Sequence, residues 1–211
     1  MFCAGHDGAV TTTRVPQEER TRAMRQRLLE ATLQCLVERG WSGTSTTLVS
    51  ERAGVSRGAQ LHHFPTKTDL VIAAVEHIAT VRRDELAQAA AALPAGERRT
   101  RQVLALLGEH FTADVFAAAL ELWVAARTDP QLLAAVEPLE RQTGRETHRV
   151  TVEMLGVDES RAGARELVQA TLDLIRGLGL ANTISDDRAR RERILDRWAD
   201  VLDDELPRRH Q

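Results

Sequence analysis

Two short helical segments within residues 44–67 meet at a tight turn, Ala53-Gly54-Val55. Each segment is about two helical turns long, and Gly54 can adopt the left-handed conformation that reverses a chain tightly. Apolar side chains are spaced to pack into one small core: Val49, Ala53, Val55 and Phe64. The pattern predicts a helix-turn-helix, whose second helix enters the major groove of duplex DNA with its N-terminus first.

This stretch resembles the DNA-binding domain of TetR-family transcription regulators. In that family a first helix ends in glycine and an aromatic residue, and Thr-Ser or Thr-Thr precedes a short helix. Ala-Gly-Val-Ser, Gly-x-Leu-Tyr-x-His-Phe and a lysine that opens the fourth helix follow. The matching residues here are Gly40-Trp41, Thr44-Ser45, Ala53-Gly54-Val55-Ser56, Gly58, His63-Phe64 and Lys67. Beyond residue 80 the resemblance lies only in the architecture.

The resemblance implies how these residues would meet DNA. Thr46 and Thr47, at the start of the second helix, would hydrogen-bond a phosphate or a base edge. Ser56 would cap the recognition helix and offer its hydroxyl to a phosphate. Arg57 would place its planar fork on O6 and N7 of a guanine. Gly58 would let the backbone approach the DNA closely.

The recognition helix departs from the family pattern at one point. Gln60-Leu61 stand where the family has Leu-Tyr, so the usual tyrosine contact with phosphate is lost. Either the helix is rotated so that Leu61 packs inward and Gln60 reaches an adenine edge, or Gln60 is partly buried. His63 and Lys67, the only lysine, are expected to contact phosphates. The predicted DNA-contacting set is Thr46, Thr47, Ser56, Arg57, Gly58, Gln60, His62, His63 and Lys67.

The sequence offers little support for metal or catalytic chemistry. His62 and His63 are adjacent, and neighbours on a helix point about 100° apart, which makes a poor chelate. We find no zinc-protease or CxxC spacing, no nucleophile–base pair and no phosphate-binding loop. Two cysteines make no disulfide framework, and Cys35 falls within an apolar helical stripe. We expect no metal and no cofactor, and a small all-α enzyme is the least supported alternative.

Composition and charge favour an all-α protein with a nucleic-acid-binding end. Helix formers dominate, and aromatic residues make up 3% of the chain. Residues 14–67 hold nine basic and five acidic side chains, whereas residues 68–211 hold 19 basic and 25 acidic ones. A basic segment on an acidic body suits a DNA-binding head. The sequence lacks the ~18-residue apolar run of a membrane span and a signal-peptide pattern, so we expect a cytoplasmic protein without a membrane partner.

Helical periodicity and chain breakers predict about nine helices. Residues 1–16 are expected to be a disordered arm, residues 17–66 a three-helix DNA-binding domain, and residues 67–211 a helical ligand-binding and dimerisation domain. The first helix is expected to end at Gly40, and the fourth to run from Thr66 toward Leu93. Later helices are predicted at roughly 98–112, 114–127, 129–155, 159–181 and 186–206.

The middle helices hold the candidates for a sensing site. Aromatic side chains with one or two polar groups suit a pocket for an apolar ligand, although core packing is the alternative. Arg127 and His148 are expected either to orient a polar group of the ligand or to lie on the surface. The sequence does not name the ligand, which we expect to be a small, largely apolar effector. The predicted ligand-binding set is His110, Phe111, Phe116, Trp123, Arg127 and His148.

The last two predicted helices carry more apolar surface than one chain is expected to cover. The family resemblance implies that they pair with their copies in a four-helix homodimer interface, and burial within one chain is the alternative. A dimer would place two recognition helices about 34 Å apart on a near-palindrome. The predicted interface residues are Leu167, Leu174, Ile175, Leu178, Ile194, Trp198 and Val201.

Together these patterns predict a sequence-specific transcription regulator, a repressor that a small molecule releases from a palindromic operator. A regulator or activator with the same head but without a ligand is the alternative. A lined cavity in the body favours the sensor, and a filled core favours the alternative.

Overall fold

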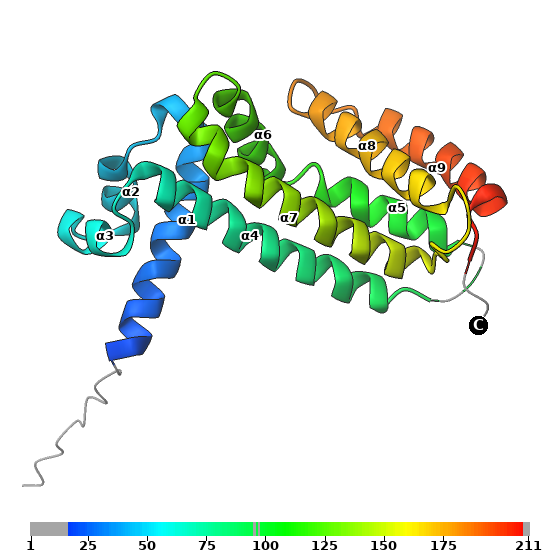
Figure 1. Cartoon of the computed structure of the whole chain (residues 1–211), viewed down its shortest axis with the longest axis horizontal. Helices are drawn as coiled ribbons and strands as arrows, with labels where there is room; N and C mark the ends of the chain where they lie inside the picture. Colours follow the sequence, from blue (N-terminus) through cyan, green and yellow to red (C-terminus); the bar gives the residue numbers. More distant parts are fainter. Residues whose placement is uncertain (1–16, 95, 97, 209–211) are drawn as a thin grey trace, which may run out of the picture.

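A computed structural model describes residues 17–94, 96 and 98–208. Within these ranges every regular element is a helix, apart from one isolated antiparallel bridge between Val157 and Arg208 (Figure 1). The all-α prediction is confirmed, and the predicted arm, residues 1–16, lies outside the described residues. The helices are α1 (Gln17–Gly43), α2 (Thr46–Ala53), α3 (Arg57–His63), α4 (Lys67–Ala91), α5 (Arg99–His110), α6 (Asp114–Ala126), α7 (Pro130–Leu155), α8 (Ala164–Asn182) and α9 (Arg188–Glu205).

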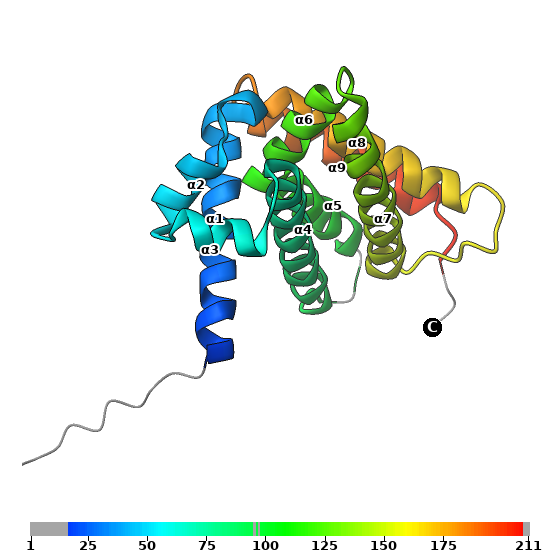
Figure 2. The same ribbon diagram turned by 60° about the vertical axis from the view of Figure 1, so that its left-hand side comes forward.

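Helices α1, α2 and α3 gather at one end of the molecule and form the head (Figures 1 and 2). The predicted small core is present there, because Val49, Ala53, Val55 and Phe64 are all buried in one cluster with α1. The Cys35 thiol is fully buried in the same cluster, and burial raises its pKa. Leu70 of α4 completes this core, so the division between domains at residue 66 remains a prediction.

Helix α4 connects the head with the body. The first turns of α4 pack in the head through Leu70. Val71 and Val75 belong to a second cluster with α1, α6 and α7. Leu86, near the C-terminal end of the helix, belongs to the large core of the body. In Figure 1, α4 and α7 run side by side along the length of the body, and α8 and α9 lie together at the opposite end from α3. One continuous helix therefore touches the DNA-binding core and the interior of the body.

Two helix boundaries differ from the predictions for local reasons. Gly40 has a left-handed φ of 64°, as the expected end of α1 requires, but the chain resumes a helical course to Gly43, so α1 is kinked. Helix α8 begins at Ala164 and not near residue 159. Gly163, with φ of 82°, precedes it, and the Asp158 carboxylate accepts from the backbone and hydroxyl of Ser160 in a turn.

Among the described residues, no single helix is both long enough and apolar enough to span a bilayer. The adjacent pair α5 and α6 meets the criterion only when taken together, and the two helices are bent by 57° at their junction.

Candidate DNA interface and body cavity

The turn between α2 and α3 is built by three capping interactions. The Ser45 hydroxyl accepts from the backbone N–H of Leu48 at 3.2 Å and caps α2. Gly54 ends α2 in the left-handed conformation, with φ of 62°. The Ser56 hydroxyl then accepts from the backbone N–H of Ala59 at 3.3 Å and starts α3. These caps define where α2 starts, where it ends and where α3 starts.

Most of the predicted DNA-contacting residues lie on the surface of the head. Thr47 is exposed in the first turn of α2, and Thr46 beside it is half-buried. Arg57, Gly58 and His62 are exposed on α3. Ser56 is also exposed, and His63 is half-buried. Apart from Gln60, the set therefore lies where DNA could reach it, and its contacts with DNA remain predictions.

The prediction that Gln60 contacts DNA is wrong. Its side chain is fully buried, and its Nε2 donates to the backbone carbonyl of Phe64 at 2.6 Å. Leu61, by contrast, is 43% exposed, so α3 is not rotated to bury it. Gln60 occupies the inward position that the family fills with leucine, because the spacing of Val55 and Phe64 in the core fixes the rotation of the helix.

Lys67 has a partner within the protein. Its ammonium donates to the backbone carbonyl of Trp41 and lies 4.0 Å from the centre of the Trp41 ring. Partial burial lowers the pKa of Lys67. An ammonium carries three donors, so this bond leaves Lys67 able to donate to a phosphate as well.

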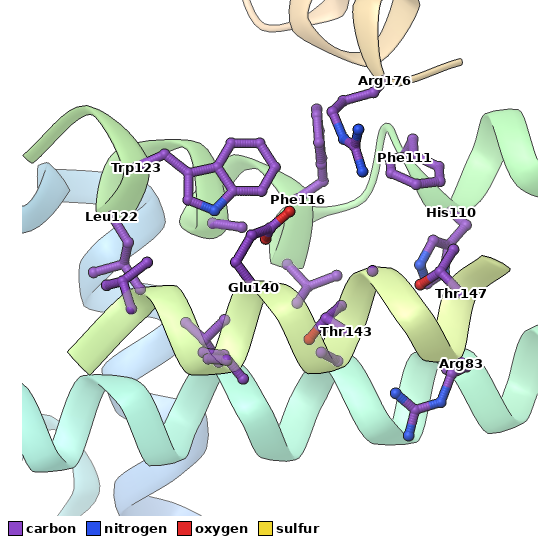
Figure 3. Close-up of a pocket in the computed structure, with 17 residues that line it drawn as sticks. Arg83, His110, Phe111, Phe116, Leu122, Trp123, Glu140, Thr143, Thr147 and Arg176 are labelled. Atoms are coloured by element: carbon purple, nitrogen blue, oxygen red, sulfur yellow. The ribbon is translucent and has the colours of Figure 1, made fainter. Parts of the chain in front are cut away.

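The body contains a cavity of about 70 Å³ among α4, α5, α6, α7 and α8. Figure 3 shows side chains from these helices converging on it, with Arg176 entering from α8. Four predicted ligand-binding residues line it: His110, Phe111, Phe116 and Trp123. The rings of Phe111 and Phe116 meet edge to face at 5.4 Å, as do those of Phe116 and Trp123 at 6.0 Å. These three rings form a continuous aromatic wall.

Polar groups face this aromatic wall. Burial raises the pKa of the Glu140 carboxyl, an effect that the charge of Arg176 and the indole N–H of Trp123 partly offset. Burial lowers the pKa of His110, and nearby arginines lower it further. The Arg176 guanidinium lies about 6 Å from the ring centres of Phe111 and Trp123, and it pairs with Asp173 at 2.7 Å. Its buried Nε has no hydrogen-bond partner among the described residues.

Arg127 and His148 do not line this cavity, so of the two alternatives for them the ligand-orienting role finds no support here. Arg127 is exposed at the end of α6, and His148 bonds the Glu159 carboxylate at 2.7 Å through its Nε2. Glu140 and Arg176 also line the cavity, and neither was among the predicted residues. A charged residue inside an apolar helical stripe is the signal that could have found Arg176, since it follows Ile175 in a largely apolar stretch of α8.

A second concave surface lies along α8 and α9. It is an open groove whose floor includes Leu174, Ile194, Trp198 and Val201, and arginines at positions 190, 193 and 197 border it. Three predicted dimer residues, Leu167, Ile175 and Leu178, do not belong to it. The side chains of Ile175 and Leu178 are 1% and 5% exposed within the single chain, because they face the core of the body. Leu167 is half-buried and packs against the same core.

Metal binding finds no geometric support within the part of the chain that the structure describes. No three side chains of the types His, Cys, Asp or Glu come together there to hold an ion. The rings of His62 and His63 meet edge to face at 5.4 Å, so they do not converge on one point.

Comparison with known proteins supports this description. The sequence profile of the tetR family of bacterial regulatory proteins matches residues 28–74, which cover most of α1, the helix-turn-helix and the start of α4. The HTH-type transcriptional regulator CymR of Pseudomonas putida is 35% identical over 182 residues, which are 84% of this chain and 88% of that protein.

Solved structures share the architecture. A TetR-family transcriptional regulator from Mesorhizobium loti superposes with a TM-score of 0.70 at 16% identity, over 89% of this chain and 98% of that one. A transcriptional regulator from Saccharomonospora viridis in complex with choline has a TM-score of 0.63 at 19% identity, over 92% and 100% of the two chains. At these identities the likeness shows the fold alone.

Proposed function

Because this chain belongs to the TetR family of bacterial regulatory proteins and is a DNA-binding transcription regulator, we propose that it is a repressor controlled by a small molecule in the body cavity. One observation carries the proposal. Helix α4 begins at Lys67, three residues after Phe64, the C-cap of α3. Farther along the same helix, Val75, Ala79 and Arg83 line the cavity. A change in the cavity wall therefore acts on the helix that holds the recognition helix.

The head docks on duplex DNA through α3. The N-terminal residues of a recognition helix face the base edges, which gives Arg57 and Gly58 the position nearest the major groove. Arg57 pairs with a guanine, while Thr47 and His63 contact the backbone and set the register. The protein acts where the chromosome is, in the cytoplasm.

The effector is small and largely apolar, with one polar end. The wall of Phe111, Phe116 and Trp123 supplies apolar contact area, and a cavity of about 70 Å³ restricts the size of an occupant unless the walls move. The unpartnered Nε of Arg176 and the carboxyl of Glu140 are the polar groups that would orient it. The related fold that binds choline supports a ligand site in such a body. A lined cavity favours a sensor over a ligand-independent regulator.

A homodimer forms through the groove of α8 and α9. Leu174, Ile194, Trp198 and Val201 are half-buried in one chain, so a second copy would cover apolar surface that is otherwise in water. Two heads held about 34 Å apart read a near-palindrome, because a single short recognition helix covers too few bases.

Binding of the ligand and binding of the operator are linked by a coupling free energy between the two sites. A ligand that prefers the DNA-free arrangement shifts the protein toward it, and coupling of about 1–3 kcal/mol changes operator affinity about 5–150-fold. Reciprocity requires that bound operator weakens ligand binding by the same factor.

The test has two stages. Selection of bound DNA from random sequence with the full-length protein should recover a two-fold symmetric site, and affinity for it should fall steeply with salt. Small apolar compounds are then screened for thermal stabilisation of the free protein, and the hits are titrated against the operator complex. A compound that stabilises the protein but leaves operator affinity unchanged would refute release by a ligand. Recovery of an asymmetric site would refute the paired heads.

A further inference from the structure

The backbone of Trp41, at the corner between α1 and α2, is held from two sides. Its N–H donates to Oε2 of Glu121 on α6 at 3.3 Å. Its carbonyl accepts from the ammonium of Lys67, the first residue of α4, and that ammonium also lies 4.0 Å from the centre of the Trp41 ring. One residue of the head is therefore bonded both to α6, which carries part of the cavity wall, and to the helix that follows the recognition helix.

The missing side chain of Gly40 leaves room for the Glu121 carboxylate beside this backbone. A Cβ at Gly40 would lie 2.5 Å from Oε2 of Glu121, closer than real Cβ contacts. The φ of 64° at Gly40 also turns the N–H of Trp41 out of the regular helical path. The bond joins positions 80 residues apart in sequence. The kink in α1 thus provides a docking point for a carboxylate of the body.

Helix α6 carries Glu121 directly before two residues of the cavity wall. Leu122 and Trp123 face the cavity, whereas Glu121 is exposed and reaches toward the head. Leu122 also packs in one buried cluster with Leu36 of α1 and Val71 of α4. A shift of α6 that makes room in the cavity must move the Glu121 carboxylate, because well-packed helices move as units.

We propose that Glu121 is a positioning residue that ties the orientation of the DNA-binding head to the wall of the body cavity. This inference rests on the proposed function and names the contact through which α6 acts on the head. An occupant that displaces α6 moves the carboxylate away from the N–H of Trp41. The corner of α1 and α2 is then held only by Lys67 and by apolar packing, and the two heads lose their common spacing on DNA.

The experiment needs no ligand, because a side chain can fill the cavity. Gly144 of α7 lines it, and a Cβ built there meets no atom within 4 Å. In Gly144→Leu the added side chain occupies the cavity and presses on its walls. Operator affinity is measured by fluorescence anisotropy at fixed salt for the full-length parent, Gly144→Leu, Glu121→Ala and the double variant. The DNA is the site selected with the parent protein.

In this double-mutant cycle we expect the effects of Gly144→Leu and Glu121→Ala on operator affinity to be non-additive. Gly144→Leu should weaken operator binding of the parent by a factor within about 5–150-fold, whereas in the Glu121→Ala background the same substitution should have at most a small effect. Glu121→Gln keeps an acceptor oxygen and should restore most of the coupling. The matched controls are Glu137→Ala, an exposed carboxylate of α7, and Ala134→Leu, an exposed position on the same helix, and neither should alter the cycle.

Two results separate this inference from the function on which it rests. An equal loss of affinity on filling the cavity, with and without Glu121, would overturn the role of Glu121 and leave control by the cavity intact. No loss of affinity on filling the cavity of the parent would overturn both. Thermal unfolding and light scattering of each variant identify any loss that comes from misfolding, and Glu121→Met, which keeps the length of the side chain but has no acceptor oxygen, then carries the comparison in place of Glu121→Ala.

Discussion

Substitution of the buried Gln60 by leucine should stabilise the protein. Oε1 of Gln60 is buried without a hydrogen-bond partner among the described residues, and such a group costs about 1–3 kcal/mol. The substitution also loses the bond from Nε2 to the Phe64 carbonyl, whose net worth is about 0.5–1.5 kcal/mol. Leucine has a similar size and leaves no large cavity. The difference between the midpoints of these ranges is a gain of about 1 kcal/mol in the free energy of unfolding, and this is an upper bound because the Phe64 carbonyl loses its donor.

The assay is thermal unfolding of parent and Gln60→Leu at one protein concentration, because association contributes to apparent stability. A gain of about 1 kcal/mol corresponds to a rise in Tm of about 2–4 °C for a chain of this size. Leu61→Gln, at the exposed neighbouring position, is the control and should change stability by no more than about 0.5 kcal/mol.

The same variant tests the orientation of the recognition helix. Since the Gln60 side chain faces the core, DNA selected with Gln60→Leu should have the same sequence as DNA selected with the parent. A lower Tm would refute the account of the unpaired oxygen. A changed preference at one base position would refute the inward orientation of Gln60.

Three further outcomes are expected. Arg57→Ala should weaken operator binding by about 1–3 kcal/mol and relax selection at one base position, whereas a uniform loss on all sequences would mean a phosphate contact. Ile194→Glu in the α8–α9 groove should give a monomer or aggregate by light scattering, while Val124→Glu, 68% exposed on α6, should keep the mass of the parent. Because burial raises the pKa of Glu140 above 4.5, its ionisation destabilises the fold as pH rises past that value, so Glu140→Gln should be more stable than the parent at pH 7. That advantage should vanish well below pH 4.5, and a difference independent of pH in urea unfolding would contradict the assignment.

The head was largely predictable because its signals are local. A serine before each short helix and a glycine between them fix the caps and the turn, and both are readable without knowledge of the rest of the chain. The all-α class followed from composition in the same way. Both ends of α7 were placed within a residue, because Pro130 at its start and Gly156 after it interrupt the pattern.

Side chains that depend on contacts between distant helices were not predictable. Periodicity showed that α8 is apolar on several sides, but only the packing of α5, α7 and α9 decided that Ile175 and Leu178 face inward while Leu174 faces the groove. The aromatic wall of the cavity was found because aromatic residues are scarce and clustered in the sequence. Its polar groups were missed, since Glu140 and Arg176 lie on different helices and meet only in the folded chain.

The sequence by itself determined the DNA-binding motif, the helical class and the apolar content of the body, since these depend on residue type and short spacing. The tertiary structure alone decided which way each polar side chain points. Gln60 lies inside because the head core sets the rotation of α3, and the Glu121 carboxylate reaches the backbone N–H of Trp41 across 80 positions because the folded chain brings α6 beside the kink at Gly40. Packing between helices sets the rotation of each helix and brings distant segments together. The periodicity of one helix shows only which of its residues share a face.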